Sequence, residues 1–321
     1  MTTIAAIRAA AARLDGHAAL TPLLNAPLLD RIAGRRILIK AECLQRTGSF
    51  KYRGARAALT LISPETRGVL AFSSGNHAQG IALAASELGL PAVILMPDDA
   101  PQVKIDNTRA YGAEVILYDR ATTDRDALGA DLCASRHLHL VRPYDDPDVI
   151  AGQGTVGLEI AAQASALGIT EADMIVCCGG GGLASGTGIA LAYLAPTMRL
   201  HTAEPAGFDD MARSLASGHI QRNPALTGSI CDAILTPEPG RITFPILQSL
   251  HAKGLTVTDA EALRALALAF HHLRIVLEPG GAVALAAALF HDGLADTCIC
   301  TASGGNVDPD VFRAALDSNR I

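Results

Sequence analysis

A lysine that could take part in chemistry stands at position 51, in the stretch "GSFKYRGA" at residues 48–55. Most lysines in proteins are exposed, so a solvated surface charge is the simplest interpretation of Lys51. The alternative is that its amine reacts with a ligand. The segment alone does not choose between the two, and the choice depends on which other segments lie beside it.

A second candidate is the turn in "FSSGNHAQG" at residues 72–80, between an expected strand and an expected helix. Small polar side chains at Ser73, Ser74 and Asn76 stand there together with backbone N–H groups at a helix start. This combination suits a carboxylate ligand, because the N–H groups and the helix dipole both favour negative charge. An ordinary helix N-cap is the alternative.

Four consecutive glycines form a third candidate, in "CCGGGGLASG" at residues 177–186. Glycine costs backbone entropy on folding, and this run lies between an expected strand and an expected helix. Its N–H groups could surround a phosphate, although the spacing matches neither the dinucleotide fingerprint nor a P-loop. A flexible turn is the alternative. Ser303, which ends an apolar run in "TASGGNVDP", is either a turn residue or a neutral hydroxyl that faces a ligand.

The elements that must position these residues follow from hydrophobic periodicity. Short apolar runs alternate with longer amphipathic segments, which predicts parallel sheets covered by helices on both faces. We expect strands at 36–42, 68–74, 92–96, 114–118, 173–178, 199–204 and 297–303. We expect helices at 77–88, 103–111, 151–167, 183–194 and 308–317, and a further one that a capping box opens at Thr258–Glu261. In such sheets ligands bind at the carboxyl ends of strands.

Composition limits the class of protein. Half of the 321 residues are hydrophobic and 18% are charged, so we expect a large core and no global disorder. A net charge of −6 without a basic run argues against nucleic acid or a membrane surface as a partner. The N-terminus is typical of an amphipathic helix and not of a signal peptide. Seven cysteines without a CxxC pair predict reduced thiols in a cytoplasmic protein.

Together these segments resemble a known family. Their order and spacing are similar to those of the fold-type II pyridoxal-phosphate enzymes, in particular the threonine/serine dehydratases and serine racemases. The resemblance runs from "TPLLNAPLL" (21–29) to "SGGNVD" (303–308) and includes "VIAGQGTVGLEI" (149–160) and "LEPGGAVALAA" (277–287). It implies an α/β fold with two open, twisted, mostly parallel sheets. It also implies a small domain at 68–145, inserted in a large domain formed by 1–67 and 146–321.

The resemblance assigns roles to the candidate residues. Lys51 is the Schiff-base lysine, and Phe50 packs against the cofactor ring. Asn76 hydrogen-bonds the ring hydroxyl, and Ser303 is the partner of the pyridine nitrogen. The phosphate loop comprises Gly179, Gly180, Gly181, Gly182 and Leu183. The turn that holds the substrate carboxylate comprises Ser73, Ser74, Gly75 and His77. Ser74 also stands where serine racemases have the acid/base on the opposite face of the substrate.

The implied reaction is the β-elimination of a β-hydroxy amino acid to a 2-oxo acid and ammonia. L-threonine and L-serine are the expected substrates, with 3-hydroxyaspartate, phenylserine or serine racemisation as alternatives. A serine opposite the pyridine nitrogen gives a weaker electron sink than a carboxylate, which disfavours transamination. A cofactor-carrying sensor without turnover is the rival class. Arg125 and Tyr144 could contact the substrate side chain, whereas Glu278 has no role that we can derive.

The resemblance further implies a homodimer and a divalent cation, Mg²⁺, Ca²⁺ or Mn²⁺. The expected metal ligands are the carboxylates of Glu204 and Asp210 and the carbonyl oxygen of Phe208. Hard cations prefer such oxygen ligands. A helix that begins with acidic residues in its first turn is the alternative. We expect no C-terminal regulatory domain of the kind found in biosynthetic threonine dehydratases, and hence no control by isoleucine.

Overall fold

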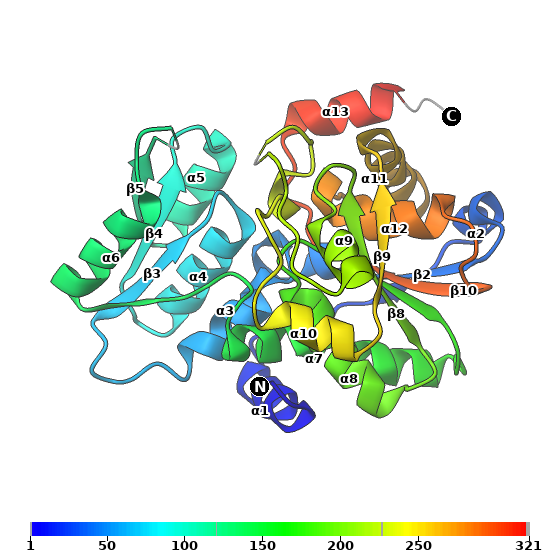
Figure 1. The fold of residues 1–321 in the computed structure, drawn as a ribbon, viewed down its shortest axis with the longest axis horizontal. Coiled ribbons are helices and arrows are strands. Elements are labelled where there is room, and N and C mark those ends of the chain that lie inside the picture. The colour runs from blue at the N-terminus through cyan, green and yellow to red at the C-terminus, as the bar shows by residue number, and fades with distance from the viewer. Residues whose placement is uncertain (1, 120, 226, 319–321) are drawn as a thin grey trace.

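The structure is a computed structural model that describes residues 2–119, 121–225 and 227–318. It contains two separate sheets with helices around them (Figure 1). The larger sheet has the strand order β1-β2-β10-β7-β8-β9, and the smaller one has the order β5-β4-β3-β6. In these two sheets only β1 runs antiparallel to its neighbour, so both are mostly parallel, and the predicted fold class is confirmed.

The bounds of the strands show that each sheet has a distinct origin in the sequence. The large sheet is formed by β1 (Leu23–Leu24), β2 (Arg36–Lys40), β7 (Asp173–Cys177), β8 (Arg199–Pro205), β9 (Lys253–Val257) and β10 (Thr297–Thr301). The small sheet is formed by β3 (Gly68–Phe72), β4 (Ala92–Pro97), β5 (Glu114–Tyr118) and β6 (Leu138–Leu140). All four strands of the small sheet therefore fall between residues 68 and 140.

Helices surround both sheets. The first six are α1 (Ile4–Leu14), α2 (Pro27–Ala33), α3 (Lys51–Leu59), α4 (Asn76–Glu87), α5 (Gln102–Ala110) and α6 (Arg125–Arg136). The others are α7 (Pro147–Ala166), α8 (Gly182–Leu194), α9 (Asp210–Ser217), α10 (Thr243–Ser249), α11 (Asp259–Leu273), α12 (Pro279–Phe290) and α13 (Pro309–Ser318). Short 3-10 turns occupy Glu42–Leu44, Arg46–Gly48 and Asp232–Ile234. Within the described residues, no helix combines the length and the apolar character that a membrane span requires.

The core explains why some of these helices have no polar face. In α12 every residue from Pro279 to Leu289 is buried, and the helix packs against β7, β8 and β10. A helix that is apolar on all sides is stable only when it is enclosed in this way. The capping box at Thr258 and Glu261 is present, and it opens α11 as predicted.

Candidate active site

A cavity of about 1000 Å³ brings the candidate segments together. Its walls come from the carboxyl ends of strands in both sheets, which is where open parallel sheets bind ligands. Lys51, the turn at residues 73–77, the glycine loop at 179–183 and Ser303 all line it. Residues more than 250 positions apart in the chain thus face one space.

Lys51 is the first residue of α3, and its half-buried side chain lines the cavity. Nζ donates a hydrogen bond to the Pro143 carbonyl oxygen at 2.9 Å and lies 5.2 Å from the centre of the Phe50 ring. Burial lowers the pKa of Lys51 to about 8, although the Glu278 carboxyl opposes the change. The amine is therefore neutral at a lower pH than an ordinary lysine, and a neutral amine is the nucleophilic form.

The glycine loop connects the end of β7 to the start of α8. Among the described residues, the backbone N–H groups of Gly179–Leu183 have no hydrogen-bond acceptor. Gly181 has φ +93°, a conformation that favours glycine, and a Cβ atom at Gly180 would lie 2.2 Å from the Tyr144 ring. Unpartnered N–H groups at a helix N-terminus form a site for an oxyanion.

The turn between β3 and α4 presents small polar groups to the same cavity. The Ser73 hydroxyl accepts a hydrogen bond from the Gly75 N–H at 3.1 Å. The Ser74 hydroxyl lines the cavity and has no hydrogen-bond partner in the part of the chain that the structure describes. Ser74 is thus available to a ligand, whereas Ser73 stabilises the turn.

His77 also belongs to this turn, but it is not a cation. Its Nε2 lies 3.1 Å from the Val141 carbonyl oxygen. Burial and the nearby Lys51 lower the pKa of His77 to about 3, so the imidazole is neutral. Because a carbonyl oxygen accepts hydrogen bonds, Nε2 carries the proton and donates a hydrogen bond to the Val141 carbonyl oxygen. His77 therefore offers no positive charge to a carboxylate.

A buried polar cluster lies beside Asn76. Its side-chain amide donates a hydrogen bond to Glu278 and accepts one from Asn306 at 2.8 Å. Burial raises the pKa of Glu278 to about 7, and Lys104 Nζ lies 3.7 Å from the Glu278 carboxyl. Lys104 also forms an ion pair with Asp232 at 2.8 Å. All of these residues line the cavity, so the cluster forms part of its wall.

Ser303 follows β10 directly and is buried. Its carbonyl oxygen accepts a hydrogen bond from the Phe50 N–H at 3.1 Å, so the end of β10 is tied to the segment before Lys51. The Cys177 thiol lies next to the Ser303 hydroxyl, and burial raises the pKa of that thiol. The thiol beside the hydroxyl is therefore neutral, which suits contact with a neutral ring nitrogen.

The acidic residues expected to bind a metal have partners within the protein. The Glu204 carboxylate, at the end of β8, accepts hydrogen bonds from the N–H groups of Met211 at 2.9 Å and Ala212 at 2.7 Å. It therefore stabilises the start of α9. One Asp210 carboxylate oxygen accepts a hydrogen bond from Asn223 at 2.6 Å, and the other is buried without a partner in the part of the chain that the structure describes. Across the described residues there is no group of three or more His, Cys, Asp or Glu side chains arranged for a metal ion.

Sequence reasoning named Tyr144 but missed the backbone groups just before it. The segment from Val141 to Tyr144 holds His77 and Lys51 through its carbonyl oxygens and packs Tyr144 over the glycine loop. A backbone carbonyl has no signature in the sequence, so Val141 and Pro143 could not be identified. Lys104 and Asp232 lie far apart in the chain, at 104 and 232, and no local pattern pairs them.

These groups fit pyridoxal phosphate. The free N–H groups of the glycine loop suit its phosphate, the Lys51 amine suits its aldehyde, and the Ser303 hydroxyl suits its pyridine nitrogen. The fold and the site therefore define an α/β enzyme built around a reactive lysine and a phosphate-binding glycine loop.

Comparisons with known proteins support this class. The family model described as "Pyridoxal-phosphate dependent enzyme" matches residues 14–302. An L-threo-3-hydroxyaspartate ammonia-lyase of Pseudomonas sp is 42% identical over 313 residues, covering 96% of each chain. A serine racemase of Schizosaccharomyces pombe is 37% identical, covering 94% of this chain and 93% of that protein. The solved structure of a threonine deaminase from T.th. has a TM-score of 0.90 at 42% identity, covering 95% of this chain and 99% of that one.

The chain belongs to the family of pyridoxal-phosphate dependent enzymes, in the fold-type II group that contains threonine deaminases, serine racemases and hydroxyaspartate ammonia-lyases. The predicted family and fold class are confirmed. The roles of the individual site residues stay predictions, and they enter the proposal below.

Proposed function

We propose that this protein is an ammonia-lyase that eliminates water from a β-hydroxy amino acid. Water then hydrolyses the resulting imine, so that the net products are a 2-oxo acid and ammonia. The observation that supports it most directly is the surroundings of Lys51. Its half-buried amine, with a pKa of about 8, shares one cavity with the N–H groups of Gly179–Leu183 and the hydroxyl of Ser74, none of which has a hydrogen-bond partner among the described residues. A family member that had lost turnover would have no reason to keep all three.

In this proposal each segment holds one part of the cofactor or the substrate. Gly179–Leu183 bind the phosphate, Lys51 attaches to the aldehyde, Phe50 packs on the ring and Ser303 contacts the pyridine nitrogen. Asn76 contacts the ring hydroxyl, and the turn at residues 73–75 binds the substrate carboxylate. Because His77 is neutral, its contribution there is a shape fixed by its bond to Val141 rather than a charge.

Proton transfer falls to two side chains. Pyridoxal phosphate, when bound, supplies an electron sink for the charge left by a departing α-proton. The Lys51 amine takes that proton from one face, since its lowered pKa gives it a neutral fraction near pH 8. The Ser74 hydroxyl is the candidate acid or base at the other face. Elimination alone needs only Lys51, whereas racemisation needs both.

The identity of the substrate depends on the far wall of the cavity. L-threonine and L-serine remain the leading prediction. One observation favours 3-hydroxyaspartate instead: Arg125 and Arg142 both line the cavity, and the Arg125 guanidinium lies 5.6 Å from the centre of the Phe72 ring, one residue before Ser73. An arginine there could bind a second substrate carboxylate. The relative from Pseudomonas sp is named for that substrate.

A substrate panel tests the proposal. Holoenzyme would be given L-threonine, L-serine, their D-enantiomers, 3-hydroxyaspartate and phenylserine, with 2-oxo acid and enantiomer composition measured. Rapid 2-oxo acid from threonine or serine supports the leading prediction. Turnover confined to 3-hydroxyaspartate, lost in Arg125→Met or Arg142→Met, supports the alternative. Enantiomer exchange faster than elimination makes the protein a racemase, and no turnover on any of them contradicts the proposal.

A Lys51→Ala variant separates the enzyme from the rival class, a cofactor-carrying sensor. We expect it to lose the visible absorbance of the bound cofactor and all turnover, with the fold unchanged by circular dichroism. If the variant turned over substrate at nearly the rate of the parent, Lys51 would not be the catalytic lysine. An absorbance band in the parent without turnover on any substrate would favour the sensor.

We also propose that a divalent cation binds between Glu204 and Asp210 with the Phe208 carbonyl oxygen. The support is the buried Asp210 carboxylate oxygen that has no partner among the described residues. Titrating the metal-free protein with Mg²⁺, Ca²⁺ or Mn²⁺ should raise its melting temperature, and Asp210→Asn should remove that increase. An equal increase in both proteins would place the ion elsewhere.

Three broader expectations belong to the same proposal. Residues 68–145 form a small domain that closes on the substrate, since all four strands of the small sheet fall in this range. Closure would exclude water from the reacting groups. We further expect a homodimer, which light scattering after gel filtration would test, and a cytoplasmic location, which the composition of the chain predicts.

A further inference from the structure

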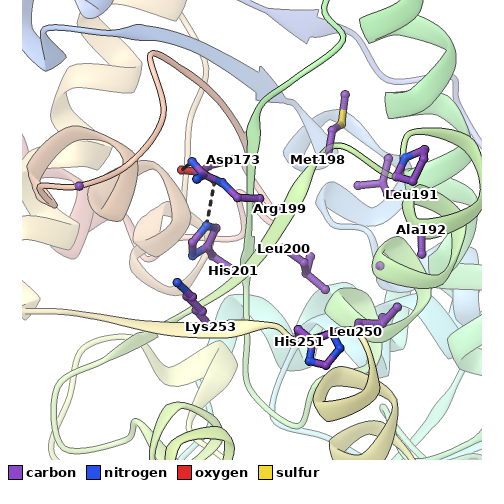
Figure 2. Close-up of a pocket in the computed structure, with 13 residues that line it drawn as sticks. Asp173, Leu191, Ala192, Met198, Arg199, Leu200, His201, Leu250, His251 and Lys253 are labelled. Carbon is purple, nitrogen blue, oxygen red and sulfur yellow. Dashed lines mark hydrogen bonds and ion pairs between the residues drawn. The ribbon is translucent and has the colours of Figure 1, made fainter.

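A second cavity, of about 320 Å³, lies at the amino ends of strands in the large sheet, whereas the active site lies at the carboxyl ends. Asp173, Arg199 and Lys253 line it, and these residues begin β7, β8 and β9 (Figure 2). The active-site cavity lies at the carboxyl ends of strands and shares no described lining residue with this one. The second cavity is therefore not an extension of the catalytic site.

The acidic group in this cavity is already satisfied. The Asp173 carboxylate accepts hydrogen bonds from Arg199 Nε at 2.7 Å, Arg199 Nη2 at 3.0 Å and the Ala295 N–H at 2.7 Å. Although burial opposes it, the hydrogen bond from Arg199 holds the pKa of Asp173 below its usual value. Asp173 is thus a paired carboxylate and offers no free charge to a cationic ligand.

The basic groups are not all satisfied. Lys253 is exposed at the cavity and makes no ion pair with any residue that the structure describes. His201 is only 7% exposed, its Nε2 lies 3.1 Å from Asp173, and its Nδ1 is buried without a hydrogen-bond partner in the described chain. Buried polar atoms without partners are uncommon in folded proteins and call for an explanation. When both ring nitrogens carry protons, Nε2 faces Asp173 and Nδ1 can donate a hydrogen bond to a ligand oxygen.

Apart from the His251 imidazole, the side chains of the remaining wall are apolar. They include Leu191 and Ala192 of α8, Met198, Leu200 and Leu250. Figure 2 shows Leu191, Ala192 and Met198 apart from the group formed by Asp173, Arg199 and His201. The cavity therefore has a basic side and an aliphatic side, and its volume matches the lower end of the range for small-ligand sites.

We propose that this cavity binds a small carboxylate with a short, uncharged apolar chain, such as an aliphatic monocarboxylate or a 2-oxo acid. The carboxylate faces Lys253 and His201, and the chain packs on Leu191 and Leu250. A free amino acid fits less well, because its ammonium group would face the basic side. The only carboxylate among the described lining residues is Asp173, which is paired with Arg199.

Calorimetric titration of the holoenzyme with butanoate tests this site. Lys253→Met removes the unpaired charge, and Ala192→Trp fills the cavity without changing its charge. Arg313→Met, an exposed arginine on α13, is the matched control for loss of a surface charge. Losing a charge-assisted contact should weaken binding about tenfold in the first variant. We expect a similar or larger loss in Ala192→Trp and none in Arg313→Met.

Other results would overturn the proposal. Equal affinity in all four proteins would mean that butanoate binds only at the active site, and undetectable binding in the parent would mean that the cavity takes no carboxylate. If L-threonine bound to the second cavity as tightly as butanoate or more tightly, the proposed selection against an ammonium group would be wrong. Lyase turnover is measured in parallel and should be the same in all four, which keeps this test independent of the proposed function.

Discussion

The chemistry of the site depends on where single side chains lie. Lys51 occupies the first position of α3, but its amine turns inward to a backbone carbonyl instead of to water. Removing an ammonium group from water disfavours its charged form, and this is the main reason for its lowered pKa. The positive end of the helix dipole at the same position acts in the same direction.

The pKa of Lys51 predicts how the apoprotein captures its cofactor. The lysine reacts as the neutral amine, so the rate of capture should rise about tenfold per pH unit below pH 8 and level off above it. Stopped-flow absorbance after mixing with pyridoxal phosphate would measure this rate. Free N-acetyl-lysine methyl amide, as a control, should keep accelerating to about pH 10. A protein rate that does the same would show that Lys51 is not perturbed.

At the scale of elements, the close packing of the glycine loop leaves no room for a side chain at Gly180. A Cβ at Gly180 would meet the Tyr144 ring at 2.2 Å, so one of the two must move. Gly188 lies five residues past the loop, within α8, and the nearest atoms to a Cβ there would belong to the flexible side chains of Leu200 and Leu250. The two positions form a matched pair for testing the loop.

We therefore predict different outcomes for Gly180→Ala and Gly188→Ala. The first should weaken binding of pyridoxal phosphate at least tenfold, because Tyr144 and the loop N–H groups are displaced. The second should change it less than twofold. Fluorescence titration of the apoproteins with the cofactor would measure both, and their melting temperatures would report any general loss of stability. Equal affinities would show that the loop tolerates the methyl group.

The elements that the sequence predicted well are those with a clear local signal. Buried strands such as 92–97 and 173–177 are continuous apolar runs, and the capping box at Thr258 marks the start of a helix. The strands β1, β6 and β9 were missed, since "LL" and "LHL" are too short for a pattern and "KGLTV" has no continuous apolar run. The helix expected at 151 begins at Pro147, because the Asp146 side chain caps it.

Some residues of the candidate site could likewise be predicted from the sequence, and others could not. Glycines, serines and a lysine at strand ends could be predicted, because their types and spacing are visible in one sequence. The carbonyl oxygens of Val141 and Pro143, and the contact between Lys104 and Glu278, depend on three-dimensional packing. The charge of His77 was unpredictable for the same reason, since its burial next to Lys51 lowers its pKa.

At the scale of the whole molecule, a buried ionic network joins the parts that support the site. Arg53, in α3, bonds Glu42 at 2.8 and 2.9 Å and Glu159 of α7 at 2.6 and 2.9 Å. Lys40 of β2 also reaches Glu159, at 2.5 Å. Arg53 and Glu42 are both fully buried, so neither charge has water as a substitute partner. The network fixes α3, and with it Lys51, against the large sheet.

Breaking this network should cost much stability. We predict that Arg53→Met lowers the free energy of unfolding by about 3–5 kcal/mol, because it leaves Glu42 buried without its partner. Arg46→Met is the control: Arg46 pairs with Glu87 at 3.3 Å but is 47% exposed, so its loss should cost less than about 1 kcal/mol. Urea unfolding would measure both. Similar losses would mean that the network contributes no more than a surface pair.

The position of β10 in the large sheet has a consequence for the newly made chain. Among the described strands β10 comes latest in the sequence, and it lies between β2 and β7, so these two strands cannot be joined in one sheet until β10 has been made. The four strands of the small sheet, encoded within 68–140, have no such delay. Lys51 is thus synthesised some 250 residues before Ser303 arrives to face it. The nascent chain acquires its cofactor site in one late step, and in a chain halted before β10 the strands β2 and β7 each have one unpaired edge.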